Sequence, residues 1–387
     1  MHLVIDASNI RSGGGVTYLV ELLSAADPQA HGFNHVTVWS GTCTLDRLPD
    51  RPWLERVHHP WLDGPLPARL LWQLCKLSQQ LDGCDLLFAP GGTYVGGFHP
   101  FVTMSRNLLP FDIRERARFG RSPMRLKFHL LERSQTSTFR RADGLIYLTS
   151  EAREVVEARM GPVDGTVTII PHGVSTSFRE HPRPAQSLDA YSFQDPFRWL
   201  YVSIVTVYKH QWYVCEAVAS LRAQGLPIAL DLVGPSTRSG LRRLQDTVAR
   251  VDPAGEFIRY HGAVPYQQLA THYHQADAFV FASSCETFGQ ILLEAMSAGL
   301  PIACSDRSAM PEILGDAGIW FDPEQPESIA RAMSTLMRSA SLRARLARAA
   351  YDKSLQYSWE RCANETFAFL SRVADVFHDR QGVTHVH

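Results

Sequence analysis

Two glutamates, Glu286 and Glu294, are the side chains whose type and spacing best suggest chemistry in this sequence, with seven residues between them. The apolar run 278–284 before them is typical of a buried parallel strand, and apolar residues then recur at helical spacing from Phe288. A glycine and a proline end this helix, and a second apolar run follows at 301–304. The stretch therefore predicts a βαβ unit whose ligand side is the carboxyl end of its first strand.

The separation of the two glutamates limits what they can do together. Two helical turns correspond to a rise of about 11–12 Å, so the carboxylates cannot share one metal ion or one proton, but they can contact opposite ends of an elongated ligand. The amides of 288–291 would be unpaired donors in the first turn and would form an anion site. A nucleotide-diphosphate sugar, with a polyol at each end and phosphates between, fits this layout. From spacing alone a plainer alternative is slightly favoured, in which Glu286 stabilises the helix dipole and Glu294 lies on the surface.

A glycine-rich turn near the N-terminus has the same strand–loop–helix character. The apolar run 3–7 leads to three glycines at 13–15, and a helical pattern follows from Val16. Glycine lets a ligand approach the backbone closely. Because no Gly-Lys-Ser/Thr follows, the sequence does not indicate an ATPase.

The run from Tyr260 to Phe321 resembles the E-x7-E region of the retaining glycosyltransferases of family 4. The similarity includes the turn at Gly262–Val264 and the Ala-Asp pair at 276–277. The resemblance implies an α/β fold of the GT-B type, with two Rossmann-like domains facing across a cleft. It also implies transfer of a hexose from a nucleotide-diphosphate sugar with retention at the anomeric carbon.

Site residues follow from the same resemblance. Glu286 and Lys209 are the implied catalytic residues: Lys209 would neutralise the donor diphosphate, and Glu286 would orient the donor sugar. Glu294 would hold the ribose hydroxyls. The implied donor-binding residues are Gly14, Gly15, Lys209, Gly262, Val264, Glu286, Thr287, Phe288, Gly289, Gln290, Ile291 and Glu294. Neither a cofactor nor a metal is expected, since no Asp-x-Asp pair stands at a strand end.

The sequence departs from the family pattern in two places. Many relatives carry a histidine in the first half where this chain has Arg106 and Asn107, and an expected arginine near Lys209 falls on Ile204 or Tyr208. A charge-assisted hydrogen bond contributes about 1.5–3 kcal/mol, so another group must share the diphosphate charge. Arg106 and Asn107 are therefore candidates for binding a phosphate or the acceptor, and a surface role for Arg106 is equally open.

Length and composition favour two ordinary globular domains. The chain has 387 residues, of which 45% are hydrophobic and 20% charged, with a net charge of −1, which argues against disorder and nucleic-acid binding. The expected segments are a first, acceptor-side Rossmann-like domain at 1–180, a linker at 181–196, a nucleotide-sugar-binding domain at 197–359, a helix at 360–378 that crosses back to the first domain, and a disordered tail at 379–387.

The predicted compartment is the cytoplasm. Seven cysteines without a C-x-x-C pair suggest reduced thiols, and no apolar run reaches the ~18 residues needed to span a bilayer. The N-terminus leads directly into a strand, which predicts that no signal peptide is present.

A basic segment at 114–141 is the feature that bears on the acceptor. It holds nine Lys and Arg against Glu115 and Glu132, with apolar residues interleaved. The default interpretation is a solvated helix face. The alternative is peripheral attachment to the inner membrane face, aided by an upstream aromatic loop region that contains Trp61 and Trp72.

We therefore expect a glycosyltransferase that uses a GDP- or UDP-linked donor and a glycan acceptor, linked to polyprenyl diphosphate. The process would be synthesis of a bacterial surface polysaccharide, such as lipopolysaccharide O-antigen, capsule or exopolysaccharide. Two alternatives stay open. A sugar-nucleotide epimerase has the same layout but needs an acid/base pair, and a non-catalytic nucleotide-sugar-binding subunit would keep Glu294 and lose Lys209 or Glu286.

Overall fold

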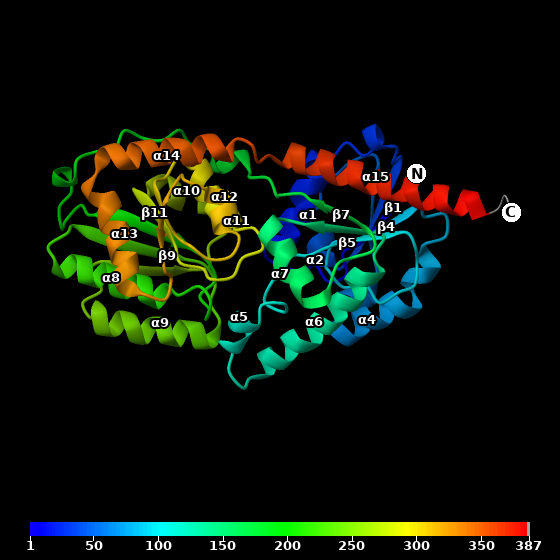
Figure 1. Cartoon of the computed structure of the whole chain (residues 1–387), viewed down its shortest axis with the longest axis horizontal. Helices are drawn as coiled ribbons and strands as arrows, with labels where there is room; N and C mark the ends of the chain where they lie inside the picture. Colours follow the sequence, from blue (N-terminus) through cyan, green and yellow to red (C-terminus); the bar gives the residue numbers. More distant parts are fainter. Residues whose placement is uncertain (385–387) are drawn as a thin grey trace. The chain divides into compact units, whose positions relative to one another are not determined.

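The computed structural model describes residues 1–384, which fold as two compact units (Figure 1). The first unit contains residues 1–113, 121–173 and the C-terminal segment from Tyr357, and the second contains 114–120 and 174–356. Each unit is built on one wholly parallel sheet with helices on both faces, which confirms the predicted α/β class with two Rossmann-like domains.

The sheet of the first unit has the order β3-β2-β1-β4-β5-β6-β7. Three of its inner strands are buried along their whole length, as expected for a parallel sheet covered on both faces. The strands are β1 (His2–Asp6), β2 (His35–Ser40), β3 (Leu54–His58), β4 (Leu86–Ala89), β5 (Phe101–Met104), β6 (Gly144–Tyr147) and β7 (Thr166–Ile169).

Helices cover both faces of this first sheet. The long C-terminal helix packs against the helix that follows the glycine turn, and both belong to the first unit (Figure 1). The helices are α1 (Gly14–Ala25), α2 (Thr42–Leu45), α3 (Pro60–Asp63), α4 (Leu66–Cys75), α6 (Pro123–Arg141), α7 (Ser150–Met160) and α15 (Trp359–Thr384).

The sheet of the second unit has the order β10-β9-β8-β11-β12-β13. Its strands are β8 (Phe197–Val202), β9 (Ile228–Val233), β10 (Ile258–Gly262), β11 (Ala278–Phe281), β12 (Ile302–Ser305) and β13 (Ile319–Phe321). Its helices are α8 (Gln211–Ala223), α9 (Arg238–Val251), α10 (Tyr266–Gln275), α11 (Gln290–Ser297), α12 (Met310–Leu314), α13 (Pro326–Arg338) and α14 (Ala340–Ser354). The short helix α5 (Ile113–Ala117) begins at the end of the first unit's segment and contributes its remaining residues to the second unit.

Three expectations from the sequence need correction. The helix after Glu286 begins at Gln290 rather than Phe288, because Gly289 has a left-handed backbone, with φ of 83°, and forms the N-cap. The aromatic region around Trp61 and Trp72 is not a loop: it contains β3, α3 and α4, and Trp72 is fully buried in the first unit's core. The prediction of a disordered tail from 379 is wrong up to Thr384, since α15 continues to that residue. Residues 385–387 lie outside the described residues.

The predicted domain boundaries at 180, 196 and 359 stay predictions. The seven cysteines carry free thiols, as expected, although Cys43 and Cys75 are exposed. Within residues 1–384, none of the helices combines the length and the apolar character needed to cross a membrane.

Candidate functional site

The predicted catalytic pair meets at the carboxyl edge of the second sheet. Lys209 follows β8 and Glu286 follows β11, and these two strands are neighbours in the sheet. From β8 the chain continues to β9 and β10 on one side and later returns to β11 on the other side. This is a topological switch point, where open parallel sheets bind their ligands.

Lys209 and Glu286 form a largely buried ion pair. The ammonium group of Lys209 donates to Oε1 of Glu286, and the lysine residue is only 4% exposed. The Lys209 nitrogen also lies 5.0 Å from the ring centre of Tyr208 and 5.3 Å from that of Phe281. A charge in such surroundings needs a partner, so removing either member leaves the other uncompensated.

A hydrogen-bonded chain supports the lysine side of the pair. Nε2 of His210 lies 2.9 Å from Oγ of Ser284, and that hydroxyl lies 2.7 Å from Oε2 of Glu115 in α5. Since a carboxylate only accepts, Ser284 donates to Glu115 and accepts from the Nε2–H of His210. Burial lowers the pKa of His210 to about 3, which agrees with a neutral ring that donates through Nε2.

The segment that carries Glu115 is itself fixed to the second unit. Arg118 donates to Glu115 at 2.8 Å and also pairs with Glu324. The sequence did not identify His210, Ser284 or Glu115 as site residues. His210 could have been noticed because it directly follows Lys209 in the sequence. Nothing in the sequence spacing connects Glu115 with Ser284, which are 169 positions apart.

Glu294 lies inside the second unit and not on its surface, so the surface alternative is wrong for this residue. It is 4% exposed, and the hydroxyl of Tyr273 donates to its Oε2 at 2.9 Å. Burial raises the pKa of Glu294 to about 8, and the Tyr273 hydrogen bond opposes this only partly. The group therefore holds its proton at neutral pH and can both donate and accept a hydrogen bond.

The first turn of α11 connects the two glutamates. Gly289 caps the helix, and its carbonyl accepts from the N–H of Leu292 at 2.9 Å. Phe288 is buried beside this turn. The helix start therefore lies between Glu286 and Glu294, as the sequence predicted, and its first turn begins at Gln290 rather than at Phe288.

Gly262, another predicted donor-binding residue in this unit, ends β10 in a left-handed conformation, with φ of 71°. Its carbonyl accepts from the N–H of Gly234 at 2.8 Å. Val264 follows it and is partly exposed. Ile204, one of the two positions where an arginine was expected, is 37% exposed, and Tyr208, the other, lies against Lys209.

In the first unit the predicted residues gather around the glycine turn. Gly13 has φ of 63° and caps α1. Arg106 donates to the carbonyl of Gly14 at 2.9 Å, and its guanidinium lies 4.9 Å from the ring centre of Tyr18. A Cβ at Gly15 would lie 3.3 Å from this guanidinium, so the glycine makes room for it. Arg106 is therefore packed against the turn and is partly buried.

Asn107, next to it, accepts from the N–H of Leu109 at 3.1 Å and so shapes its own loop. Among residues 1–384, the structure contains no group of three or more His, Cys, Asp or Glu side chains that could hold a metal ion.

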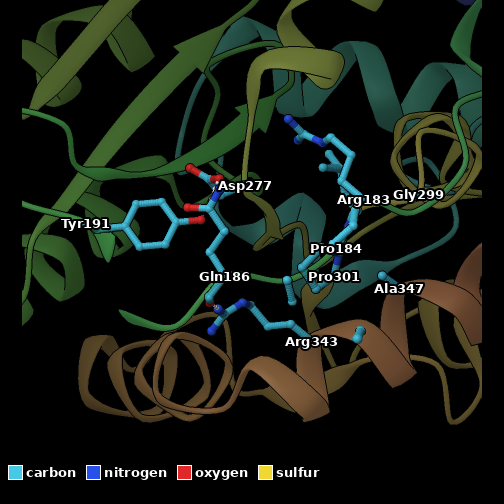
Figure 2. Close-up of a pocket in the computed structure, with 12 residues that line it drawn as sticks. Arg183, Pro184, Gln186, Tyr191, Asp277, Gly299, Pro301, Arg343 and Ala347 are labelled. Carbon is cyan, nitrogen blue, oxygen red and sulfur yellow. Dashed lines mark hydrogen bonds between the residues drawn. The ribbon is translucent and has the colours of Figure 1, made fainter. Parts of the chain in front are cut away.

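A separate pocket of about 370 Å³ lies at the opposite, amino-terminal edge of the second sheet (Figure 2). Asp277 and Pro301, the residues before β11 and β12, line it together with Arg343. Its polar groups are already engaged, because Tyr191 donates to Asp277 at 3.0 Å and Arg343 donates to the carbonyl of Leu336 at 2.7 Å. The pocket lies at the edge of the sheet opposite to the one that carries Lys209 and Glu286.

Two family models match the chain. Residues 12–178 match the model described as glycosyltransferase family 4, and residues 188–353 match glycosyl transferases group 1. The O-antigen chain mannosyltransferase B of Escherichia coli is 35% identical over 148 residues, which are 37% of this chain and 39% of that protein. The D-inositol 3-phosphate glycosyltransferase of Thermobispora bispora is 27% identical over 247 residues, covering 61% and 56% of the two chains. The chain thus spans less than two thirds of these curated relatives.

Solved structures match over nearly the whole chain. Anabaena Alr3699/HepE in complex with UDP-glucose has a TM-score of 0.69 and 15% identity, and the match covers 98% of this chain and 100% of that one. WaaG, a glycosyltransferase involved in lipopolysaccharide biosynthesis, has a TM-score of 0.69 and 15% identity, with 96% and 99% covered. At these identities the matches show the fold, which is the GT-B fold.

Proposed function

Because the chain belongs to family 4 of the glycosyltransferases, we propose that it transfers a hexose from a nucleotide-diphosphate sugar to a glycan acceptor, with retention at the anomeric carbon. The observation that carries this proposal is the buried Lys209–Glu286 pair at the switch point of the second sheet. A buried cation beside a helix start is suited to the charge of a leaving diphosphate.

The reaction needs no metal in this proposal. The bond between the anomeric carbon and the diphosphate oxygen breaks, and the acceptor oxygen bonds to the same face of the sugar. The acceptor's proton passes to the leaving diphosphate. Lys209 and the first amides of α11 stabilise the charge that develops on the leaving group, and Glu286 hydrogen-bonds the sugar hydroxyls and orients the ring.

Glu294 is proposed to bind the ribose of the donor. Its support is the buried carboxyl that keeps its proton near neutral pH, since such a group can donate to one ribose hydroxyl and accept from the other. Tyr273 fixes the orientation of the carboxyl through its hydrogen bond.

The donor base is proposed to be guanine or uracil. The name of the mannosyltransferase relative supports a mannose donor, and the structure of Alr3699/HepE in complex with UDP-glucose supports a uracil nucleotide. Thermal shift against GDP, UDP, ADP and CDP tests the choice, because a nucleotide at a hundredfold excess over its Kd stabilises the protein by about 2.7 kcal/mol. Turnover is then measured with labelled sugar nucleotides that carry the base identified by thermal shift, with and without a chelator.

A lipid-linked acceptor in surface polysaccharide synthesis is the proposed acceptor class. Helix α6 supports it, since Leu126 and Leu130 are 61% and 57% exposed among basic residues. The names of the O-antigen mannosyltransferase and of WaaG point to the same class of process. An epimerase would instead convert the donor sugar without any acceptor, so omission of the acceptor separates the two activities.

A further inference from the structure

Two residues beside the ion pair have a backbone conformation that L-amino acids other than glycine rarely adopt. Across residues 1–384, only His210 and Ser308 are non-glycine residues with positive φ, at 53° and 55°. Such strain persists where the surrounding structure enforces it, and it concentrates at functional sites. His210 directly follows Lys209 in the chain, and Ser308 is hydrogen-bonded to Glu286.

Ser308 clamps the backbone of Glu286 with a single hydroxyl. Its Oγ accepts from the N–H of Glu286 at 3.0 Å and donates to the carbonyl of the same residue at 2.8 Å. A hydroxyl is the smallest side-chain group that can do both. The left-handed turn after β12 brings Ser308 to this position, and glycine would fit the turn without providing the clamp.

His210 fixes the segment of the chain that carries Lys209. Its left-handed conformation starts α8, and its ring is tied to Ser284 two residues before Glu286. The carbonyl of Lys209 accepts from the hydroxyl of Tyr201, and its N–H donates to the carbonyl of Thr206 at 3.1 Å. The backbone of Glu286 is therefore held from the end of the neighbouring strand β12, and that of Lys209 from β8 and the loop that follows it.

We propose that Ser308 and His210 are positioning residues that hold Glu286 and Lys209 in the geometry the donor requires. For the reaction itself, this inference rests on the proposed transferase function. The left-handed backbone at both residues allows their side chains to form the hydrogen bonds that fix the Lys209–Glu286 ion pair. Replacement by glycine relaxes the backbone and releases the pair, so stability and activity should move in opposite directions.

The test compares Ser308→Gly with Ser308→Ala. Both remove the hydroxyl, but only glycine relieves the backbone. We expect kcat to fall at least about tenfold in both variants while KM for the donor stays within about threefold. The melting temperature should be equal to or above that of the wild type for Ser308→Gly and below it for Ser308→Ala. His210→Asn, which tolerates a left-handed backbone but loses the bond to Ser284, should lower kcat in the same way.

A second measurement does not depend on activity. The acylation rate of the Lys209 amine, followed by peptide mass spectrometry, should rise several-fold in Ser308→Gly because the pair loosens. Ser339→Ala is the matched control, since it removes a hydroxyl that accepts from the N–H of Leu342 at the start of α14. It should leave the Lys209 rate and kcat unchanged.

The outcomes separate the two proposals. If Ser308→Gly keeps wild-type kcat and wild-type Lys209 acylation, the positioning role is wrong. If acylation rises but the wild type transfers no sugar from any donor, the positioning role stands and the proposed function fails. If kcat falls only in proportion to lost stability in both variants, Ser308 is merely structural and the inference is overturned.

Discussion

At the scale of single residues, Lys209 and Glu286 depend on each other, because Lys209 is almost fully buried and its ammonium pairs with Glu286. Lys209→Met should lower the unfolding free energy by about 3–5 kcal/mol, since it leaves Glu286 without its counter-charge. The double variant Lys209→Met/Glu286→Gln should recover most of this loss and still fail in turnover. Melting temperatures of both variants check the prediction, and a double variant no more stable than the single one would count against an interdependent pair.

Glu294 gives a pH-dependent prediction. Its pKa is about 8 in the folded chain against an ordinary value of 4.5, so the folded state keeps a proton that the unfolded state has released between these values. Stability from this residue therefore falls as pH rises from about 4.5 to 8, by up to about 1.4 kcal/mol per pH unit.

Glu294→Gln removes this titration while keeping the shape of the side chain. Its stability relative to the wild type should rise across the same pH window, and denaturant unfolding at several pH values measures the difference. Parallel pH profiles for the two proteins would show that the carboxyl titrates normally.

Glu286 and Glu294 were candidates from their spacing around a βα turn, and the resemblance to family 4 favoured them as site residues and added Lys209. The sequence could not supply Ser308, His210 or Glu115. Their roles depend on a left-handed backbone or on contacts across long stretches of chain, such as the 169 positions between Glu115 and Ser284. Neither property has a local pattern in the sequence.

At the scale of elements, the basic segment 114–141 divides into two parts with different roles. Residues 114–120 belong to the second unit, where Arg118 pairs with Glu115 and Glu324. Helix α6 and Arg121 just before it carry the remaining positive charge, and Glu132 of α6 pairs with Arg159. Sequence periodicity predicted the strands and most helices well, but it treated this segment as one surface because ion pairs between distant residues leave no local pattern.

The membrane hypothesis can therefore be tested on α6 and the residues before it. Arg121, Arg125 and Lys127 are exposed there, and each contributes about 1 kcal/mol near an anionic surface. We expect the wild type to sediment with anionic liposomes at low salt, and the variant with all three changed to Glu to stay in solution. The same change at Arg242, Arg331 and Arg345, exposed in the second unit, is the matched control and should leave binding intact. Equal binding of both triple variants, or none by the wild type, would favour a soluble acceptor.

At the scale of the whole molecule, the two units have similar parallel sheets but carry different groups of predicted site residues. The first unit packs Arg106 and the glycine turn tightly together, and the second places a buried ion pair at the switch point of its sheet. The fold class was predictable because parallel βα units have strong periodicity and regular turn signals. The exact start of α11 was not, because it depends on the left-handed backbone of Gly289.

In the proposed function, the Lys209–Glu286 site binds the diphosphate of a sugar nucleotide. Calorimetric titration of wild type and Lys209→Met with a nucleoside diphosphate and the matching monophosphate tests it most directly. We predict that the variant loses about tenfold or more in affinity for the diphosphate, roughly 1.4 kcal/mol, and keeps its affinity for the monophosphate within about twofold. Equal loss for both ligands, or wild-type affinity of the variant for the diphosphate, would contradict the assignment.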